Sequence, residues 1–239
     1  MEGDVELSVV IPSFNEEVRL PARIQEIRTY LNHRGISHEL LLADDGSRDG
    51  TLAVMQAAAR EDPAVKVVAL PRNRGKGRAS AEGVAASRGR LVLVSDADHS
   101  TPIAEVEKLE AALANGAEVA IASRAKRGAR VEVSQPPHRV LMGKTFNLIV
   151  QALLLPGLWD TQCGFKLFQG DVARAVFADL ETDRFAFDVE VLFRARRRGY
   201  RIAEVPVRWL HSAPTRVAAI SASADMLKDV LRIRLRNPR

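Results

Sequence analysis

Apolar and polar residues form alternating blocks along the first half of the chain, and these blocks predict strands separated by helices. Short runs rich in valine, isoleucine and leucine are typical of buried strands. Such runs lie at residues 7–11, 39–43, 65–70, 91–95 and 118–123. Between the runs, apolar residues recur at helical spacing, as in Leu20, Ile24, Ile27 and Leu31. Because strand–helix–strand connections are right-handed, this order predicts an α/β fold with a mainly parallel sheet and helices on both faces.

The second half of the chain departs from this regular order. Residues 126–137 are basic, polar and end in proline, so we expect a long loop that gates the site. The pattern further predicts a helix at about 139–155, a turn and strand at 160–168, a helix at 187–198, a strand at 202–207 and a helix with a basic face at 217–235. We expect one domain over residues 1–239, with its two halves meeting near residue 124.

Polar side chains follow the predicted strands at the point where each strand ends. Asn15, Asp44, Asp96, Asp98 and Arg124 all occupy such positions. The carboxyl ends of parallel strands meet at one edge of a sheet, where α/β proteins bind their ligands. In an extended segment, residues two apart point the same way, so Asp96 and Asp98 are expected to project together. A divalent cation such as Mg²⁺ or Mn²⁺ would relieve their repulsion; an exposed acidic turn is the alternative interpretation.

A basic, glycine-rich segment at residues 71–80, PRNRGKGRAS, precedes a predicted helix of small residues. Gly75 and Gly77 allow close approach of the backbone, and Lys76 supplies positive charge, so a diphosphate is expected near this helix start. The spacing GxxxxGK[ST] of a P-loop is absent.

Composition and charge limit the class of protein. The 239 residues are 46% hydrophobic, which is enough for a proper core. The single cysteine excludes an internal disulfide and a cysteine-built zinc site. The net charge of +5 points to anionic partners. The basic residues concentrate toward the C-terminus as Arg194, Arg196, Arg197, Arg198, Arg201, Lys228, Arg232, Arg234, Arg236 and Arg239. No nucleic-acid-binding motif is present, and aromatic residues make up only 5% of the chain, so nucleic acid is not an expected partner. A solvated arginine face and an anionic membrane surface remain as interpretations.

Segments that would target or anchor the protein are not expected. Residues 1–6 are acidic and lack the basic and apolar parts of a secretory signal. The longest apolar candidate, residues 148–158, is interrupted by Gln151, Pro156 and Gly157 and is too short for a membrane helix. We therefore expect a cytoplasmic protein, with peripheral contact to a membrane through the C-terminal basic helix.

Seven segments occur in an order that resembles the inverting family-two glycosyltransferases, specifically the group acting on dolichyl phosphate with glucose or mannose. These segments are VVIPSFNEE, DDGSRDGT, RNRGKGRA, DAD, DTQCGFKLF, FDVEVLFRA and EVPVRW, and they extend from Val9 to Trp209. The resemblance implies a glycosyltransferase A-type (Rossmann-like) fold, a nucleotide-sugar donor such as UDP-glucose, Mg²⁺ or Mn²⁺, and a polyprenyl phosphate acceptor. It also implies that residues 1–124 bind the nucleotide sugar and residues 125–239 face the acceptor.

The resemblance assigns roles to individual positions. Pro12, Phe14, Glu16 and Asp44 match the residues that hold the nucleoside, with Asp44 at the base. Asp96, Ala97 and Asp98 match the metal and diphosphate motif, and Arg124 and Arg216 match basic residues near the donor. Lys76 of the glycine-rich segment is expected to bind the donor with them and to help neutralise the leaving phosphate. Ser100 stands where the mannosyltransferase branch has a glutamine that binds the metal, so this chain departs from that branch and is nearer the glucosyl branch.

The acceptor decides which residues the chemistry needs. A hydroxyl acceptor requires a general base, for which Asp188 is the first candidate and Glu190 the second. Asp188 also suits a structural role as a charge at a helix N-terminus. A phosphate acceptor is already ionised and requires cations instead, for which Arg139, Lys144 and residues 127–130 are candidates.

The sequence also bears on three other classes of function. A nucleotidylyltransferase typically has a glycine-rich loop after the first strand, and a dinucleotide-dependent oxidoreductase has GxGxxG there; this chain has neither. A catalytically silent nucleotide-sugar-binding protein is expected to have lost Asp98 or Asp188, and both are present.

Overall fold

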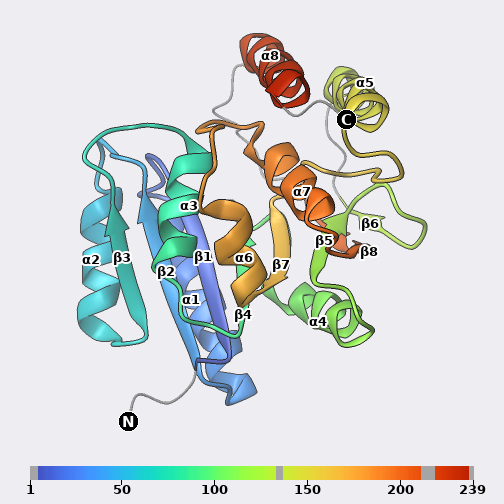
Figure 1. Cartoon of the computed structure of the whole chain (residues 1–239). Helices are drawn as coiled ribbons and strands as arrows, with labels where there is room; N and C mark the ends of the chain where they lie inside the picture. Colours follow the sequence, from blue (N-terminus) through green and yellow to red (C-terminus); the bar gives the residue numbers. More distant parts are fainter. Residues whose placement is uncertain (1–4, 133–136, 211–218, 237–239) are drawn as a thin grey trace.

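A seven-stranded sheet forms the centre of the molecule (Figure 1). The computed structural model describes residues 5–132, 137–210 and 219–236. The strand order is β3-β2-β1-β4-β7-β5-β8. The strands are β1 Leu7–Ser13, β2 His38–Asp44, β3 Val65–Ala69, β4 Leu91–Ser95, β5 Val119–Ser123, β7 Phe165–Gln169 and β8 Ile202–Pro206. All neighbouring pairs are parallel except those of β7, which runs antiparallel to β4 and β5.

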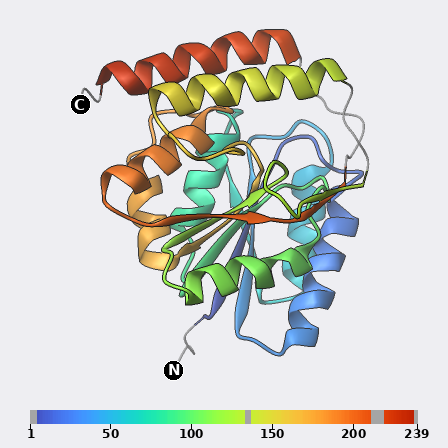
Figure 2. The ribbon, with the colours of Figure 1, turned by 90° about the vertical axis from the view of Figure 1, so that its right-hand side faces the viewer.

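Helices cover both faces of this sheet. The first face carries α1 Leu20–Arg34, α2 Thr51–Glu61, the short 3₁₀ helix Ile103–Glu105 and α4 Val106–Ala114. The second face carries α3 Lys76–Ala85, α6 Gly170–Phe177 and α7 Phe187–Arg197. Two longer helices, α5 Pro137–Leu153 and α8 Ala219–Arg236, lie side by side beyond this second layer (Figure 2). The predicted fold class, an α/β fold with a mainly parallel sheet covered on both faces, is confirmed.

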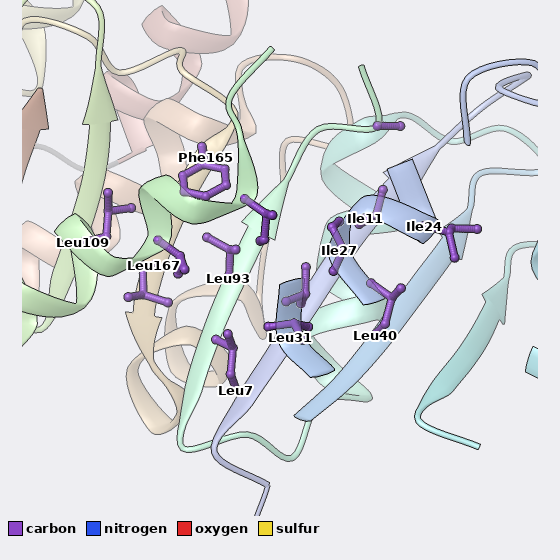
Figure 3. Packing of buried hydrophobic residues seen from close by; sticks show 14 of the residues in the cluster. Leu7, Ile11, Ile24, Ile27, Leu31, Leu40, Leu93, Leu109, Phe165 and Leu167 are labelled. Carbon is purple, nitrogen blue, oxygen red and sulfur yellow. The ribbon is translucent and has the colours of Figure 1, made fainter. Parts of the chain in front are cut away.

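Alternation along the strands explains the two hydrophobic layers. Successive strand side chains point to opposite faces, so Val9 and Ile11 pack under α1 while Val10 packs under α3. Figure 3 shows the first layer, in which Ile24, Ile27 and Leu31 of α1 meet the sheet. A fully buried leucine typically contributes about 2–5 kcal/mol relative to alanine, so these layers hold the carboxyl ends of the strands in fixed register.

The sequence prediction was incomplete in the second half. Strand β7 lies between β4 and β5, so residues from both halves of the chain share one sheet. Helix α6 was not predicted. The expected loop at 126–137 contains a short strand, β6 Arg130–Val131, which pairs with β9 Arg208–Trp209. This part of the segment is therefore tied to the body of the protein by backbone hydrogen bonds, and residues 133–136 lie outside the described structure.

In the described parts of the chain, no helix combines the length and the apolar character that crossing a membrane requires.

Candidate active site

A cavity of about 610 Å³ opens where β1, β2 and β4 end. Its walls come from six segments of the sequence. The end of β1 contributes Pro12 and Ser13, and the loop after it contributes Phe14, Asn15, Glu16 and Arg19. Asp45 follows β2, Asn73 and Gly75 precede α3, and Lys76 and Ala79 lie in the first turn of α3. The loop after β4 contributes Asp96, Ala97 and Asp98, the loop before α7 contributes Arg184 and Phe185, and α8 contributes Asp225, Met226 and Asp229. The cavity therefore contains residues from both halves of the chain, which also contribute strands to the same sheet.

The acidic loop after β4 is seated on the start of β7. The backbone N–H of Asp96 donates to the carbonyl of Gly164 at 3.1 Å. A Cβ placed on Gly164 would overlap the carboxylate of Asp96, so only glycine leaves room for this side chain. The antiparallel pairing of β4 with β7 produces this contact, because Ser95 lies opposite Phe165.

Substitution of Gly164 by alanine is expected to displace the Asp96 carboxylate and to lower the rate of catalysis about 10-fold or more. The reason is that a shift of about 1 Å in a positioned group can cost up to 100-fold in rate. Steady-state kinetics together with urea unfolding would test this. Gly143→Ala on α5 is the matched control, because a Cβ there meets nothing within 4 Å. A Gly164→Ala enzyme with unchanged kinetics would contradict the expected role.

Asp98 offers a hard oxygen ligand to a cation in the cavity. Its Oδ1 accepts a hydrogen bond from the Ser100 N–H at 3.0 Å, which orients the carboxylate. Within the described residues, no group of three or more histidine, cysteine or acidic side chains converges on one point. An ion at Asp98 would therefore complete its coordination with phosphate oxygens and water. Mg²⁺ and Mn²⁺ favour such oxygen ligands, so the side chains present fit one of these ions. Ser100 serves the loop through its backbone.

Lys76 occupies the opposite wall and forms an ion pair with the Oδ1 of Asp96. Its ammonium also lies over the ring of Phe187, 5.7 Å from the centroid. Burial opposes the charged form, but the carboxylates of Asp96, Asp188 and Asp98 outweigh it and hold the pKa of Lys76 above its ordinary value. Lys76 is therefore a permanent positive charge beside the acidic loop.

A buried arginine of α1 supports the acidic loop from below. Arg23 is 1% exposed and donates to the Ser95 hydroxyl at 2.7 Å and to the Thr101 carbonyl at 3.2 Å. Glu26 pairs with Arg23 at 2.9 Å and contacts the ring of His99 at 2.7 Å. Burial disfavours its charge, yet His99 and Arg23 together lower the pKa of Glu26 to about 2. This ion-paired frame joins α1 to both ends of the loop that carries Asp98.

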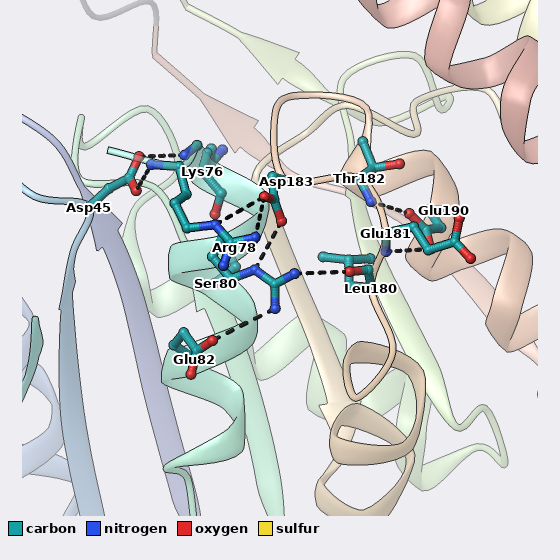
Figure 4. Close-up of polar contacts among 12 residues, drawn as sticks. Asp45, Lys76, Arg78, Ser80, Glu82, Leu180, Glu181, Thr182, Asp183 and Glu190 are labelled. Carbon is teal, nitrogen blue, oxygen red and sulfur yellow. Dashed lines mark hydrogen bonds and ion pairs between the residues drawn. The ribbon is translucent and has the colours of Figure 1, made fainter. Parts of the chain in front are cut away.

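The loop before α7 is fixed to the start of α3 (Figure 4). Asp183 accepts hydrogen bonds from Arg74 at 2.8 Å and from Arg78 at 2.9 Å. Glu190 accepts from the backbone N–H groups of Glu181 at 3.0 Å and Thr182 at 2.7 Å. The structure thus gives Glu190 a structural position: it is 4% exposed and does not line the cavity.

The nucleoside positions implied by the sequence divide into two groups. Pro12, Phe14 and Glu16 line the cavity. Asp44 is buried, accepts from the Ser47 N–H and does not line the cavity, whereas its neighbour Asp45 does. The two carboxylates are adjacent in the sequence, and only the geometry of the strand end distinguishes them.

Asp45 fixes the glycine-rich segment to the end of β2. It accepts hydrogen bonds from the Asn73 amide and from the N–H groups of Arg74 and Gly75, each at 2.8 Å. Burial raises the pKa of Asp45, although the two backbone donors favour its carboxylate form. The carboxylate therefore holds the backbone that leads into Lys76.

Arg124 follows β5 as expected but is held by another carboxylate. Its Nε lies 2.7 Å from Asp160, and its guanidinium lies 5.2 Å from the centre of the Trp209 ring. Burial opposes its charge, and Asp160 more than compensates, so the pKa of Arg124 is above its usual range. Arg124 is not among the residues that line the cavity. Nearby Cys163 is buried, which raises the pKa of its thiol to about 12 and leaves it un-ionised.

Asp188 is 5% exposed and forms a buried ion pair with Lys166 of β7 at 2.5 Å. It does not line the cavity. Lys144 is exposed on α5 and also lies outside the cavity lining. The side chain of Arg139 and all of Arg216 lie outside the described structure, so the expectations for them stay predictions.

Several cavity residues were not singled out by sequence reasoning. Ser13 is 4% exposed, and its hydroxyl has no hydrogen-bond partner among the described residues. Arg19 is held by Glu16 through two hydrogen bonds. Ser13 and Arg19 flank the motif residues Phe14 and Glu16, so proximity to that motif was an available signal. No comparable sequence signal marked Arg184, Phe185 or the side chains of α8, because packing between distant segments brings them to the site.

Comparison with known proteins identifies the family. Residues 8–177 match the family described as glycosyl transferase family 2. The chain is 38% identical to the human dolichyl-phosphate beta-glucosyltransferase over 97% of its own length and 75% of that protein. It is 34% identical to the enzyme of the same name from Dictyostelium discoideum, over 98% of this chain and 75% of the relative. The chain belongs to glycosyltransferase family 2, and it is a glycosyltransferase.

Solved structures agree on the fold. Glucosyl-3-phosphoglycerate synthase from Mycobacterium tuberculosis, in complex with Mn²⁺, UDP and glucosyl-3-phosphoglycerate, superposes with a TM-score of 0.72 at 21% identity. The match covers 98% of this chain and 81% of that one. The same enzyme with Mn²⁺ and UDP-glucose gives a TM-score of 0.70 at 20% identity, over 98% of this chain and 80% of that one. The expected glycosyltransferase A-type fold is thereby confirmed.

Proposed function

We propose that the protein transfers glucose from UDP-glucose to a polyprenyl phosphate of the dolichyl type, with inversion at the anomeric carbon and with Mg²⁺ or Mn²⁺. The observation that carries this proposal is that Asp96 and Asp98 line one cavity together with Lys76 and the motif residues Pro12, Phe14 and Glu16. The named activity of the relatives, at up to 38% identity, supports the acceptor and the sugar. The complexes of the mycobacterial enzyme with Mn²⁺ and UDP-glucose support the donor and the metal.

Different residues along the cavity would bind the nucleoside, the metal ion and the diphosphate of the donor. The end of β1 and the loop after it, with Pro12, Phe14 and Glu16, would hold the nucleoside. The Ser13 hydroxyl, which has no partner among the described residues, would donate a hydrogen bond to it. Asp98 would hold the metal ion, which neutralises the charge that develops on the departing diphosphate. Lys76 is a second fixed cation on the same leaving group, in a position that its pair with Asp96 maintains.

The acceptor chemistry is consistent with the position of Asp188. A phosphate acceptor is ionised near neutral pH and needs no base, whereas a hydroxyl acceptor needs one within hydrogen-bond reach. Asp188 is already paired with Lys166 and lies outside the cavity lining. This arrangement favours the phosphate acceptor over the soluble hydroxyl acceptor.

The proposal is tested with a panel of UDP- and GDP-sugars, each assayed with and without Mn²⁺ against a short isoprenyl phosphate and the matching isoprenyl alcohol. The expected result is transfer from UDP-glucose to the phosphate, dependent on the metal. Transfer to the alcohol alone would replace the proposed acceptor by a hydroxyl compound. Binding of nucleotide sugars without transfer or hydrolysis would indicate a silent binding protein.

We expect the exposed leucines of helices α5 and α8 to contact a bilayer that contains the acceptor. Leu141 and Leu148 of α5 are 66% and 60% exposed, and Leu231 and Leu235 of α8 are 45% and 80% exposed. Arg232, Arg234 and Arg236 accompany them on α8. Apolar side chains flanked by arginines are typical of helices that lie in the surface of an anionic membrane.

Binding to anionic vesicles is expected to weaken when these leucines are changed. Replacing Leu148 and Leu235 by serine removes apolar area that would insert into the acyl region, so vesicle affinity should fall about 10-fold or more. Sedimentation with vesicles of phosphatidylserine and phosphatidylcholine, at low and high salt, measures this directly. Val18→Ser is the control, because Val18 is 79% exposed near the start of α1. Equal sedimentation of all three proteins would contradict the role of the α5–α8 surface.

A further inference from the structure

Three basic side chains line the cavity within the described structure: Arg19, Lys76 and Arg184. Two of them already have a carboxylate partner within the site. Arg19 pairs with Glu16, and Lys76 pairs with Asp96. Arg184 differs, because none of the carboxylates of the described residues lies within ion-pair distance of its guanidinium, although it interacts electrostatically with Asp229 of α8. Its charge is thus the least compensated of the three.

The backbone that carries Arg184 is held in place from two sides. Asp183 is bound by Arg74 and Arg78 at the start of α3, and the N–H groups of Glu181 and Thr182 are bound by Glu190 of α7 (Figure 4). Gly75 and Gly77 allow this close packing, since a Cβ on either would overlap the carbonyl of Asp183 or Thr182. These hydrogen bonds fix the backbone of Arg184 beside the cavity, and the side chain itself is exposed.

We propose that Arg184 binds the phosphate of the acceptor and orients it for attack on the sugar. This inference rests on the proposed function and names a residue for its second substrate. The acceptor phosphate must enter a cavity that already holds a diphosphate, and like charges at close range repel strongly in a partly desolvated site. A guanidinium can hold two phosphate oxygens at once and leaves the third free to react.

The charge balance of the reaction agrees with this placement. A phosphate oxygen of the acceptor forms a bond to the anomeric carbon, and the bond from that carbon to the diphosphate breaks, with its electron pair leaving on UDP. No proton is released, because the attacking oxygen carries a negative charge beforehand. One negative charge thus moves from the acceptor to the leaving group. Arg184 would bind the acceptor phosphate before the transfer, whereas the metal ion and Lys76 would stabilise the diphosphate that leaves.

The neighbouring carboxylates of α8, Asp225 and Asp229, do not neutralise the positive charge of Arg184. Asp225 lies 3.6 Å from Lys228, and Asp229 lies 3.1 Å from Arg232, so each has a cation on its own helix. Carboxylates in this position can also accept hydrogen bonds from sugar hydroxyls. Among the described residues that line the cavity, Arg184 is therefore the cation that remains available to a phosphate.

The test uses Arg184→Gln and Arg184→Lys in the full chain, with UDP-glucose, Mn²⁺ and farnesyl phosphate dissolved in buffer without membranes. In Arg184→Gln, the KM for farnesyl phosphate should rise about 10- to 100-fold, since a hydrogen bond between charged groups is lost. In Arg184→Lys, the KM for farnesyl phosphate should rise less than in Arg184→Gln, because the positive charge is kept. The affinity for UDP with Mn²⁺, measured by calorimetry, should stay within about twofold. Arg60→Gln, on the exposed side of α2, is the control for the loss of one positive charge.

The possible failures are distinguishable. An unchanged KM for farnesyl phosphate in Arg184→Gln would overturn the inference while leaving the proposed function intact. A loss of UDP affinity equal to the loss in acceptor KM would also overturn it, because Arg184 would then serve the donor. If the wild-type protein transfers glucose to farnesol but not to farnesyl phosphate, the proposed acceptor and this inference both fall.

Discussion

Replacing Asp98 by alanine is expected to abolish metal-dependent binding of the donor. The side chain lines the cavity and is the hard oxygen ligand that the loop after β4 orients through Ser100. Even changes to residues that only support metal ligands commonly cost about 10- to 100-fold in affinity or activity, so loss of the ligand itself should cost at least about 100-fold. Calorimetry with UDP and Mn²⁺, followed by transfer assays at saturating metal, measures both effects.

Glu107→Ala serves as the control, because Glu107 is an exposed carboxylate on α4 that contacts Tyr30 at 2.8 Å and lies outside the cavity. It should bind UDP and Mn²⁺ as the wild type does. If Asp98→Ala retains the wild-type affinity for UDP and the same response to Mn²⁺, the assignment of the metal to this loop is wrong. The thermal unfolding of both variants establishes that any loss comes from the site and not from the fold.

The first half of the fold was predictable because its signals are local. Each buried strand is a short apolar run that ends in a polar residue, so periodicity and composition together located β1 to β5. The edge of the sheet followed from the parallel order, and with it the meeting of Asn15, Asp96 and Asp98 in one cavity. Asp44 and Arg124, predicted at the same edge, do not line that cavity. A prediction of this kind requires only that neighbouring residues determine the element.

The second half was harder because its geometry depends on contacts between distant segments. The antiparallel insertion of β7 between β4 and β5 places Gly164 under Asp96, and nothing in the sequence around residue 164 requires that pairing. The position of α8 likewise could not be read from its own sequence, because its basic residues suggested only a solvated or membrane-facing helix. Its other face carries Asp225 and Asp229 into the cavity, an arrangement that packing against α5 and α7 determines.

Asp188 shows how one motif supports two interpretations until its partner is known. Its place at a helix N-terminus in a family motif suggested a general base. The partner, Lys166, lies 22 residues away on β7, and both side chains are less than 10% exposed. A charge that is neutralised in this way inside the protein is typical of a structural ion pair. The two roles predict different effects of mutation, which the following experiment separates.

Replacing Lys166 by methionine is expected to lower the free energy of unfolding by about 3–5 kcal/mol, because it leaves the carboxylate of Asp188 buried without its partner. Lys166 also donates to the Cys163 carbonyl at 2.5 Å, so the start of β7 beside Asp96 should loosen as well. Urea unfolding monitored by circular dichroism measures the change. The double variant Lys166→Met/Asp188→Leu should recover most of the loss, since it removes both charges together.

Asp188→Asn then separates structure from catalysis. If Asp188 acts only through its pair with Lys166, the variant should be less stable, while its turnover per folded molecule on a phosphate acceptor changes by less than about 10-fold. A general base would instead cost about 100-fold or more in turnover, at any stability. The measurement is the transfer rate at a temperature well below the unfolding midpoint, normalised to the folded fraction. A loss of 100-fold there, with stability unchanged, would return Asp188 to the role of base and favour a hydroxyl acceptor.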